Sequence, residues 1–297
     1  MVAGSGFAQS AKVHIQKGIP YCSAQFPGQN KMKKLCFDFY EPVGNADTLR
    51  PLVITLFGGG FVLGNREWVD MVAWCNRFAE KGYAAASIDY RLIPATQFSE
   101  KGLIRAGYMA AQDVSVAVRF FKANWAKYRI DTNRIYLLGE SAGAVAIIHS
   151  IYMDEDERPA ATFEEPELSP MHSLGTPEVR KHTPDVAGAI LLWGCIFDPK
   201  IMDPDEVTPV CFIHGAKDKI LPVDSGYSFS ISTLTYGYGS KAMAERLREL
   251  GTAPFELHVL EEEGHVFYLK RPTFFQLDAL KFENCFQIAW DFVNRKR

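Results

Sequence analysis

The stretch that decides the fold reads Arg134-Ile135-Tyr136-Leu137-Leu138-Gly139-Glu140-Ser141-Ala142-Gly143-Ala144-Val145. A short apolar run, typical of a buried strand, leads into the pattern G-x-S-x-G, and a helical pattern follows. A chain that turns sharply from strand to helix holds its serine in a strained conformation at the carboxyl end of a sheet. The flanking glycines leave room for neighbouring backbone. The stretch therefore predicts a nucleophile elbow at Ser141, and the alternative is a glycine-rich turn whose serine caps the helix.

Around this stretch, short apolar runs alternate with longer helical patterns. Runs that are apolar on both faces are typical of central parallel strands, and strand–helix alternation favours one sheet covered by helices on both faces. The sequence thus predicts an α/β protein with a mostly parallel central sheet. Strands are expected at 35–39, 52–57, 84–90, 134–138, 186–193, 207–214 and 255–260, and helices at 68–81, 103–128, 141–153 and 274–295.

One segment breaks this alternation. Residues 154–184 carry an acidic run, five prolines and little periodicity, so they are expected to form an insertion within a single domain that spans 1–297. Two interpretations stay open for it. It is either a small cap, in which Leu168, Met171 and Leu174 cover the substrate, or a solvated loop at the rim of the site.

Composition excludes several classes of function. The net charge of −3 and the lack of a long basic run give no sign of a nucleic-acid partner. No run approaches the roughly 18 apolar residues of a membrane span. Six widely spread cysteines form no C-x-x-C pair, so no metal site is expected. Residues 1–11 lack the features of a complete signal peptide and suit either an ordinary leader or the remnant of a replaced signal. Cytoplasmic and exported locations both stay open, as does the oligomeric state.

A second glycine motif lies where an oxyanion would need donors. Gly58-Gly59-Gly60-Phe61 directly follows the apolar run 52–57, and backbone without side chains can turn its N–H groups toward the serine. Ala142, at the start of the helix, would supply a further N–H, because helix N-termini favour negative charge. A phosphate cradle is the alternative for such a loop, but no P-loop lysine follows.

The general base and its acid follow from chain order. In proteins with this elbow, the nucleophile comes first, then an aspartate or glutamate, then a histidine. His265 stands in a glycine-containing loop after the last expected strand, whereas His214 precedes every plausible acid. Asp218 lies in the turn after the strand 207–214, and Asp224 is expected to cap a following helix. The predicted triad is Ser141, Asp218 and His265.

Five motifs together resemble the esterase/lipase branch of the α/β-hydrolase superfamily, near the hormone-sensitive-lipase-like esterases and type-B carboxylesterases. The resemblance covers about residues 50–268. It implies that Gly59, Gly60 and Ala142 donate the oxyanion N–H groups, and that no metal or organic cofactor is needed. The motifs are Gly58-Gly59-Gly60-Phe61, Asp89-Tyr90-Arg91-Leu92-Ile93-Pro94, Asp131-Thr132-Asn133-Arg134 with the elbow, His214-Gly215-Ala216-Lys217-Asp218, and Gly264-His265.

Two positions depart from the family pattern. Phe57 stands where the family usually has a histidine before the glycines, so packing must replace the support that a histidine side chain gives. Ala144 stands where the family often has a second glycine after the elbow, which is a small steric change at a close helix–strand contact.

The expected activity is hydrolysis of small acyl or aryl carboxylic esters through an acyl-enzyme. The alternatives are a serine peptidase, an aryl-formamidase or an acyltransferase, and a non-catalytic binding module is the least favoured. A metabolite ester, a plant-wall ester and a polyester all remain possible substrates, since fold and site do not select one. Aromatic residues at expected strand ends are candidates to line the pocket, with a core position as the equal alternative. They are Phe57, Phe61, Tyr90, Trp193 and Phe197.

Overall fold

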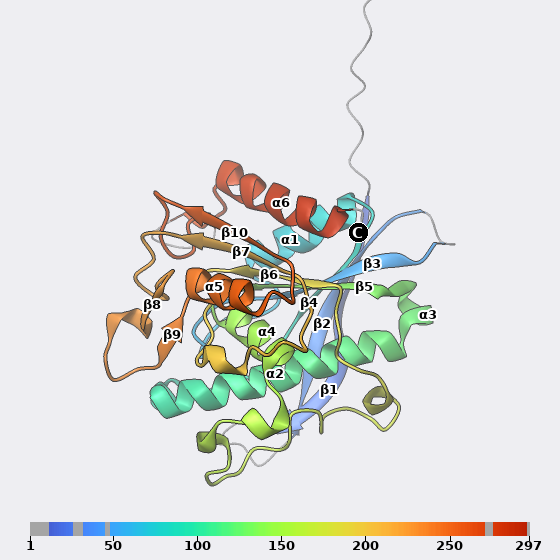
Figure 1. The fold of residues 1–297 in the computed structure, drawn as a ribbon. Coiled ribbons are helices and arrows are strands. Elements are labelled where there is room, and N and C mark those ends of the chain that lie inside the picture. Colours follow the sequence, from blue (N-terminus) through green and yellow to red (C-terminus); the bar gives the residue numbers. More distant parts are fainter. Residues whose placement is uncertain (1–11, 26–31, 45–47, 271–275, 296–297) are drawn as a thin grey trace, which may run out of the picture.

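A twisted eight-stranded sheet runs through the computed structural model, which describes residues 12–25, 32–44, 48–270 and 276–295 (Figure 1). The strand order is β1-β2-β4-β3-β5-β6-β7-β10. All neighbours pair in parallel except β1 with β2 and β2 with β4. The predicted α/β fold with a mostly parallel sheet is confirmed. The bounds are β1 Val13–Gln25, β2 Met32–Pro42, β3 Arg50–Leu56, β4 Ala84–Ile88, β5 Ile130–Glu140, β6 Gly188–Leu192, β7 Val210–Gly215 and β10 Phe255–Leu260.

Helices cover both faces of this sheet. In Figure 1, α1 (Val69–Glu80) and α6 (Ala279–Asn294) lie above it, while α2 (Glu100–Ala123), α4 (Ala142–Tyr152) and α5 (Ser240–Leu250) lie below. The two layers bury the central strands completely, as their continuous apolar sequences require. No helix in the described part of the chain is long and apolar enough to cross a membrane.

Several elements differ from the sequence-based expectation. The helix expected at 103–128 begins after Ser99, whose Oγ accepts the N–H of Gly102, and it breaks at Asn124 before the short α3 (Trp125–Tyr128). The expectation that Asp224 caps a helix is wrong. A strand follows it, and β8 (Ser225–Tyr227) pairs with β9 (Tyr236–Tyr238) in a separate two-stranded sheet. The helix expected at 274–295 begins only at Ala279, after its N-cap Asp278. Residues 274–275 and the leader 1–11 lie outside the described residues.

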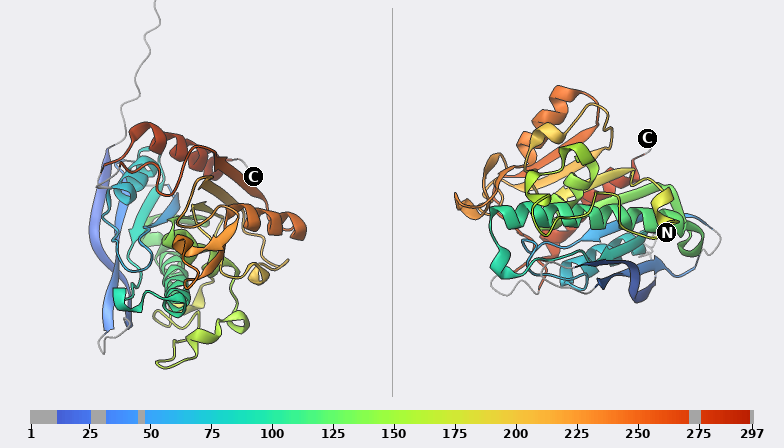
Figure 2. Two further views of the ribbon diagram at one scale, coloured as in Figure 1. Left: turned by 90° about the vertical axis from the view of Figure 1, so that its left-hand side faces the viewer. Right: turned by 90° about the horizontal axis from the view of Figure 1, so that it is seen from below.

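The insertion 154–184 packs along α2 (Figures 1 and 2). Arg105 donates to the carbonyls of Ala161 and Glu164, at 2.6 and 3.0 Å, and Tyr108 donates to the carbonyl of Ser169 at 3.1 Å. The segment has only short 3₁₀ turns of its own at Glu155–Glu157, Ala160–Thr162 and Val179–Lys181. Its backbone is thus held by side chains of the helix beneath it rather than by a core of its own.

Candidate active site

The backbone turns sharply between β5 and α4, and Ser141 stands in that turn. Its φ of 51° and ψ of −117° lie outside the regions that side chains normally favour. The flanking glycines are required by space. A Cβ at Gly139 would lie 2.6 Å from the carbonyl carbon of Gly143, and one at Gly143 would lie 2.4 Å from the carbonyl oxygen of Leu56. Any side chain there would push the serine out of place.

Two hydrogen bonds link the predicted triad. His265 Nε2 lies 2.9 Å from Ser141 Oγ, and His265 Nδ1 lies 2.6 Å from Asp218 Oδ2. Asp218 follows β7 and His265 follows the adjacent strand β10, so parallel pairing brings the two loops together. The N–H of Lys217 donates to the carbonyl of Glu263 at 2.8 Å and fixes one loop against the other. Because Nδ1 faces a carboxylate it carries the proton, which leaves Nε2 free to accept from the serine hydroxyl.

His214 is a further residue of this network that chain order had set aside. Its Nε2 lies 2.8 Å from the carbonyl of Leu221 and 3.2 Å from Asp218 Oδ2, while its Nδ1 lies 2.8 Å from Ser240 Oγ. Since Nε2 faces two acceptors, it carries the proton and Nδ1 accepts from the serine. Burial alone would raise the pKa of Asp218, but hydrogen bonds from His214 and His265 outweigh it and hold that pKa well below its usual value.

The glycine loop lies against the elbow. A Cβ at Gly58 would come within 3.3 Å of Ser141 Cβ. Gly59 and Gly60 adopt φ values of 110° and 60°, a region that favours glycine. Within the described part of the chain, no acceptor takes the N–H of Gly59, Gly60 or Ala142. Three backbone donors beside the serine are therefore available to a ligand.

Phe57 and Tyr90 support this loop from below and do not line the cavity, contrary to their predicted place in the substrate pocket. Their rings stack with centroids 4.3 Å apart, and the Tyr90 hydroxyl donates to the carbonyl of Phe57 at 2.8 Å. Gly64 leaves the space that the Phe57 ring occupies, since a Cβ there would lie 2.4 Å from that ring. Both side chains are buried because the loop covers them. This packing stands where the family's usual histidine would be.

A large cavity opens at the serine. Its volume is about 760 Å³ and it is lined mostly by apolar residues, with Asp70 and Glu140 at its floor. Trp193 lines this cavity as predicted, whereas Phe61 and Phe197 line a smaller recess of about 30 Å³ that also reaches Ser141. No residue of 154–184, all of which the structure describes, lines either space. The remaining walls of the large cavity are Gly58, Gly59, Gly60, Val62, Leu63, Trp68, Val69, Ala95, Phe98, Ile220, Phe229, His265, Val266 and Leu269.

The two acids at the cavity floor form a buried pair. Glu140 accepts hydrogen bonds from Trp74 Nε1, at 3.0 Å, and from the Tyr268 hydroxyl. Burial, together with the neighbouring carboxylate of Asp70, raises the pKa of Glu140 well above its usual range. Burial also raises the pKa of Asp70. Two carboxyl groups that cannot both ionise share one proton. Sequence reasoning missed this pair because Asp70 lies on α1 and Glu140 at the end of β5, and the spacing between them gives no local signal.

Ala144 is accommodated by a glycine on the adjacent strand end. A Cβ at Gly194 would lie 2.6 Å from Ala144 Cβ, so the two positions cannot both carry a methyl group. The glycine that the family often has on the nucleophile's helix is thus exchanged here for one just after β6.

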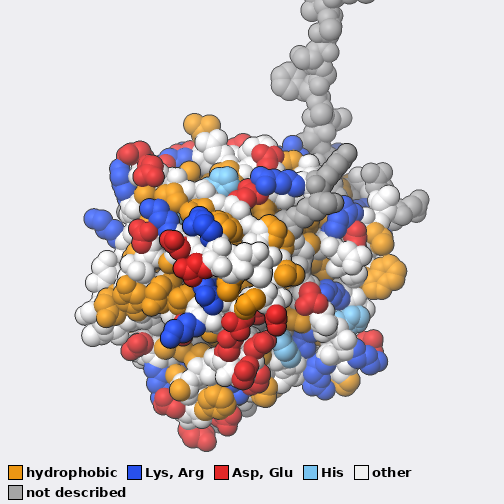
Figure 3. Space-filling model, in the orientation of Figure 1, with side chains coloured by type: hydrophobic (Ala, Val, Ile, Leu, Met, Phe, Trp, Pro, Cys, Tyr) orange, Lys and Arg blue, Asp and Glu red, His pale blue; other side chains and the backbone are white. Residues whose placement is uncertain are grey.

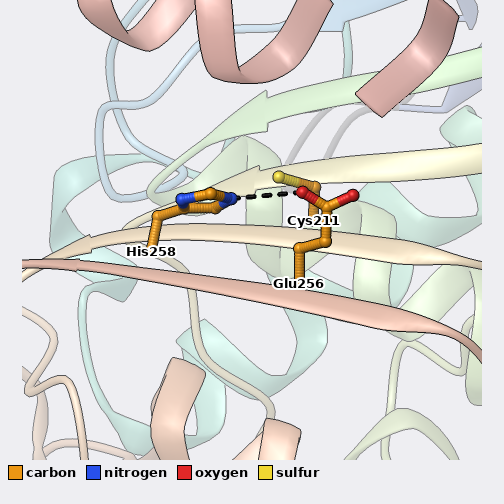
Figure 4. Close-up of side chains that lie close together, drawn as sticks. All are labelled: Cys211, Glu256 and His258. Carbon is orange, nitrogen blue, oxygen red and sulfur yellow. Dashed lines mark hydrogen bonds and ion pairs between the residues drawn. The ribbon is translucent and has the colours of Figure 1, made fainter. Parts of the chain in front are cut away.

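A cluster of potential metal ligands lies elsewhere on the sheet (Figure 4). Cys211 is near the start of β7, and Glu256 and His258 lie on β10, whereas Asp218 and His265 follow the ends of these two strands. Glu256 Oε2 lies 3.2 Å from His258 Nε2, and Glu256 Oε1 lies 2.7 Å from a guanidinium nitrogen of Arg295. The carboxylate is therefore already paired on both oxygens.

Part of the sequence is similar to known proteins. Residues 37–168 match the protein family described as BD-FAE. A probable isoprenylcysteine alpha-carbonyl methylesterase of Oryza sativa is 30% identical over 146 residues, 48% of this chain and 31% of that protein. The esterase LipC of Mycobacterium tuberculosis is 25% identical over 239 residues, 74% of this chain and 53% of that protein. The chain thus spans less than two thirds of either relative.

Solved structures show the same fold over almost the whole chain. Esterase 2 of Thermogutta terrifontis with bound propionate aligns with a TM-score of 0.62 and 18% identity, covering 96% of this chain and 93% of that one. The chain has the α/β-hydrolase fold, and the relatives and solved structures that it resembles are named as esterases.

Proposed function

We propose that this chain is a serine carboxylic-ester hydrolase in which Ser141 is the nucleophile, His265 the general base and acid, and Asp218 the residue that orients His265. The observation that carries the proposal is the unbroken line of hydrogen bonds from Ser141 Oγ through both ring nitrogens of His265 to a carboxylate. Esterase names among the relatives support the same activity.

The reaction proceeds in two acyl transfers. Ser141 Oγ bonds to the ester carbonyl carbon as its proton passes to His265 Nε2, and Asp218 stabilises the resulting imidazolium. The N–H groups of Gly59, Gly60 and Ala142 stabilise the oxyanion, a contribution of about 10²–10³ in rate for one donor. The proton then passes from Nε2 to the leaving alkoxy oxygen. In the second transfer, His265 Nε2 takes a proton from water as the water oxygen attacks the acyl carbon. The proton then passes to Ser141 Oγ as the acyl bond breaks, which releases the acid and restores the serine.

The test is a comparison of wild type with Ser141→Ala on p-nitrophenyl acetate. We expect turnover to fall by at least about 10³-fold while the far-UV circular dichroism spectrum is unchanged. A serine-directed phosphonate should label Ser141 and leave the Ser141→Ala variant unlabelled. A variant that keeps more than a tenth of the wild-type rate would exclude Ser141 as the nucleophile.

The same assay separates the neighbouring activities of this fold. An amide analogue of the ester tests for a peptidase, an N-formyl arylamine for an aryl-formamidase, and added alcohol acceptors for an acyltransferase. We expect the ester to be hydrolysed with water as acceptor and the amides to react far more slowly. Faster turnover of an amide, or preferential transfer to an alcohol, would replace the proposal with that activity.

A further inference from the structure

The two spaces beside Ser141 differ greatly in size and meet at the nucleophile. The large cavity has a volume of about 760 Å³ and the recess about 30 Å³. A space of the latter size admits roughly one or two water-sized groups, which is the size of a methyl or ethyl group. Ser141, Gly60, Ile220 and Phe229 line both spaces, so they mark the boundary at which an ester group would sit.

His265 decides which space takes which half of the ester. It lines the large cavity and not the recess. In acyl transfer the imidazole must reach the leaving oxygen in order to protonate it, so the alcohol part lies on the side of that imidazole. A second hollow of about 590 Å³ adjoins the large cavity at Ile220, His265, Val266 and Leu269, which gives a long alcohol further room toward the surface.

Ala142 lines the recess and His265 does not, so the recess is the space left for the acyl part. Phe197 and Val145 are among its walls. Phe197 is held in place by its neighbours on the side away from the recess. Its N–H donates to His149 Nε2 at 3.4 Å, and a Cβ at Gly107 would already lie 3.0 Å from its ring. The recess therefore cannot widen without displacing packed side chains.

Phe229, in the segment between β8 and β9, lines both the large cavity and the recess. Its backbone has a positive φ of 58°. Its ring contacts that of Phe98 edge-on, with the ring centroids 5.6 Å apart. Apolar side chains gather over this segment at the left of Figure 3, where Tyr227, Ile231 and Tyr236 are exposed together with part of Phe229. The bulky end of a substrate thus meets an apolar surface as it enters.

We infer that this enzyme takes esters of a short acyl group, acetyl above all, with a bulky apolar alcohol. The inference rests on the proposed esterase function and adds the substrate class. Ser141 Oγ forms its bond to the acetyl carbon while the methyl group occupies the recess. The bond between that carbon and the alkoxy oxygen then breaks on the side of His265. His265 Nε2 passes the proton that it took from Ser141 to this oxygen, and the bulky alcohol leaves through the large cavity.

An isomeric pair of substrates tests the orientation. 2-Naphthylmethyl acetate and methyl 2-naphthylacetate contain the same atoms, with the bulky group on the alcohol in one and on the acid in the other. We expect kcat/KM to favour the acetate by about 100-fold or more, since each methylene that does not fit lowers it by about tenfold or more. Equal rates, or a preference for the methyl ester, would overturn the inference.

Variants of the recess test its role independently. Phe197→Ala should raise kcat/KM for the butyrate relative to the acetate of 2-naphthylmethanol by at least about tenfold. The matched control is Leu63→Ala in the wall of the large cavity, which should change the preference among alcohols and leave the acetate-to-butyrate ratio unchanged. If Phe197→Ala does not fold, Leu103→Ala enlarges the same recess. A folded recess variant with an unchanged acyl ratio would refute the assignment.

These outcomes are distinguishable from failure of the proposed function. Turnover that depends on Ser141 but shows the reversed preference would leave an esterase with the subsites exchanged. No turnover of any ester that depends on Ser141 would remove the proposed function itself.

Discussion

The close contact between Ala144 and Gly194 yields a double-mutant prediction. A Cβ at Gly194 would lie 2.6 Å from Ala144 Cβ, far inside ordinary van der Waals contact, and the neighbouring backbone atoms of Ala144 are 3.4 and 3.6 Å away. Gly194 has no positive φ, so alanine there meets a steric clash and no backbone strain. Gly194→Ala should therefore lower the free energy of unfolding by about 1–3 kcal/mol, the usual cost of overpacking a core.

Ala144→Gly removes the clashing methyl group. Alone it should cost about 1 kcal/mol, because glycine is a poor helix residue. The double variant, Ala144→Gly with Gly194→Ala, should recover to within about 1 kcal/mol of wild type, since the remaining distances of 3.4 and 3.6 Å are ordinary contacts. The double variant is thus predicted to be about 1–3 kcal/mol more stable than the sum of the two single effects.

Urea unfolding followed by tryptophan fluorescence measures these free energies, and ester turnover is measured alongside. Because Ala144 is three residues from Ser141, activity should fall in Gly194→Ala and return in the double variant. The control is Gly251→Ala, at a site where a Cβ meets no neighbour within 4 Å but φ is +66°, so any loss there reflects backbone strain alone. A neutral Gly194→Ala variant, or additive effects in the double variant, would refute the reasoning.

Four further predictions concern the site and the insertion. Asp218→Asn should lose far more kcat than Asp224→Asn, because only Asp218 contacts His265. Comparable losses in pH-controlled kinetics would show that the acid is misassigned. His214→Ala should lower kcat, because Asp218 loses one of the two histidines that hold its carboxylate in place and so orients His265 less firmly. A loss of stability with an unaltered kcat would make His214 purely structural. For Glu140, burial raises the folded-state pKa, so the folded protein binds more protons than the unfolded chain and its stability declines as pH rises above about 5. Glu140→Gln, which keeps the acceptor for Trp74, should decline less over that range in thermal melts, and a parallel decline would contradict the shared proton. Replacing 164–174 with a Gly/Ser linker should leave the ester preference unchanged, since these residues line neither space at Ser141. A large change in KM for bulky esters would restore the cap interpretation.

Local patterns and chain order were enough to predict the fold class and to select Ser141, Asp218 and His265, which the structure joins by hydrogen bonds. The strands at the centre of the sheet are buried on both faces, so their residues must be apolar in an unbroken run, and this is visible without any tertiary information. The elbow at Ser141 is equally local, since the turn, its glycines and its flanking strand and helix are contiguous. Chain order then selected Asp218 and His265. By contrast β1, which is mostly exposed, carries no such run and was not predicted.

Only the tertiary structure decided what surrounds those residues. Asp70 and Glu140 share a cavity floor, His214 joins Asp218, and Gly194 makes room for Ala144, yet none of these pairs has a sequence pattern of its own. The same holds for Phe57 and Tyr90, which support the glycine loop, and for 154–184, which lies on α2. The physical reason is that the apolar run of a buried strand and the turn of the elbow are properties of a short stretch of sequence. A cavity wall is instead made by side chains from elements distant in the chain, and their distances exist only after the sheet has set its order and register.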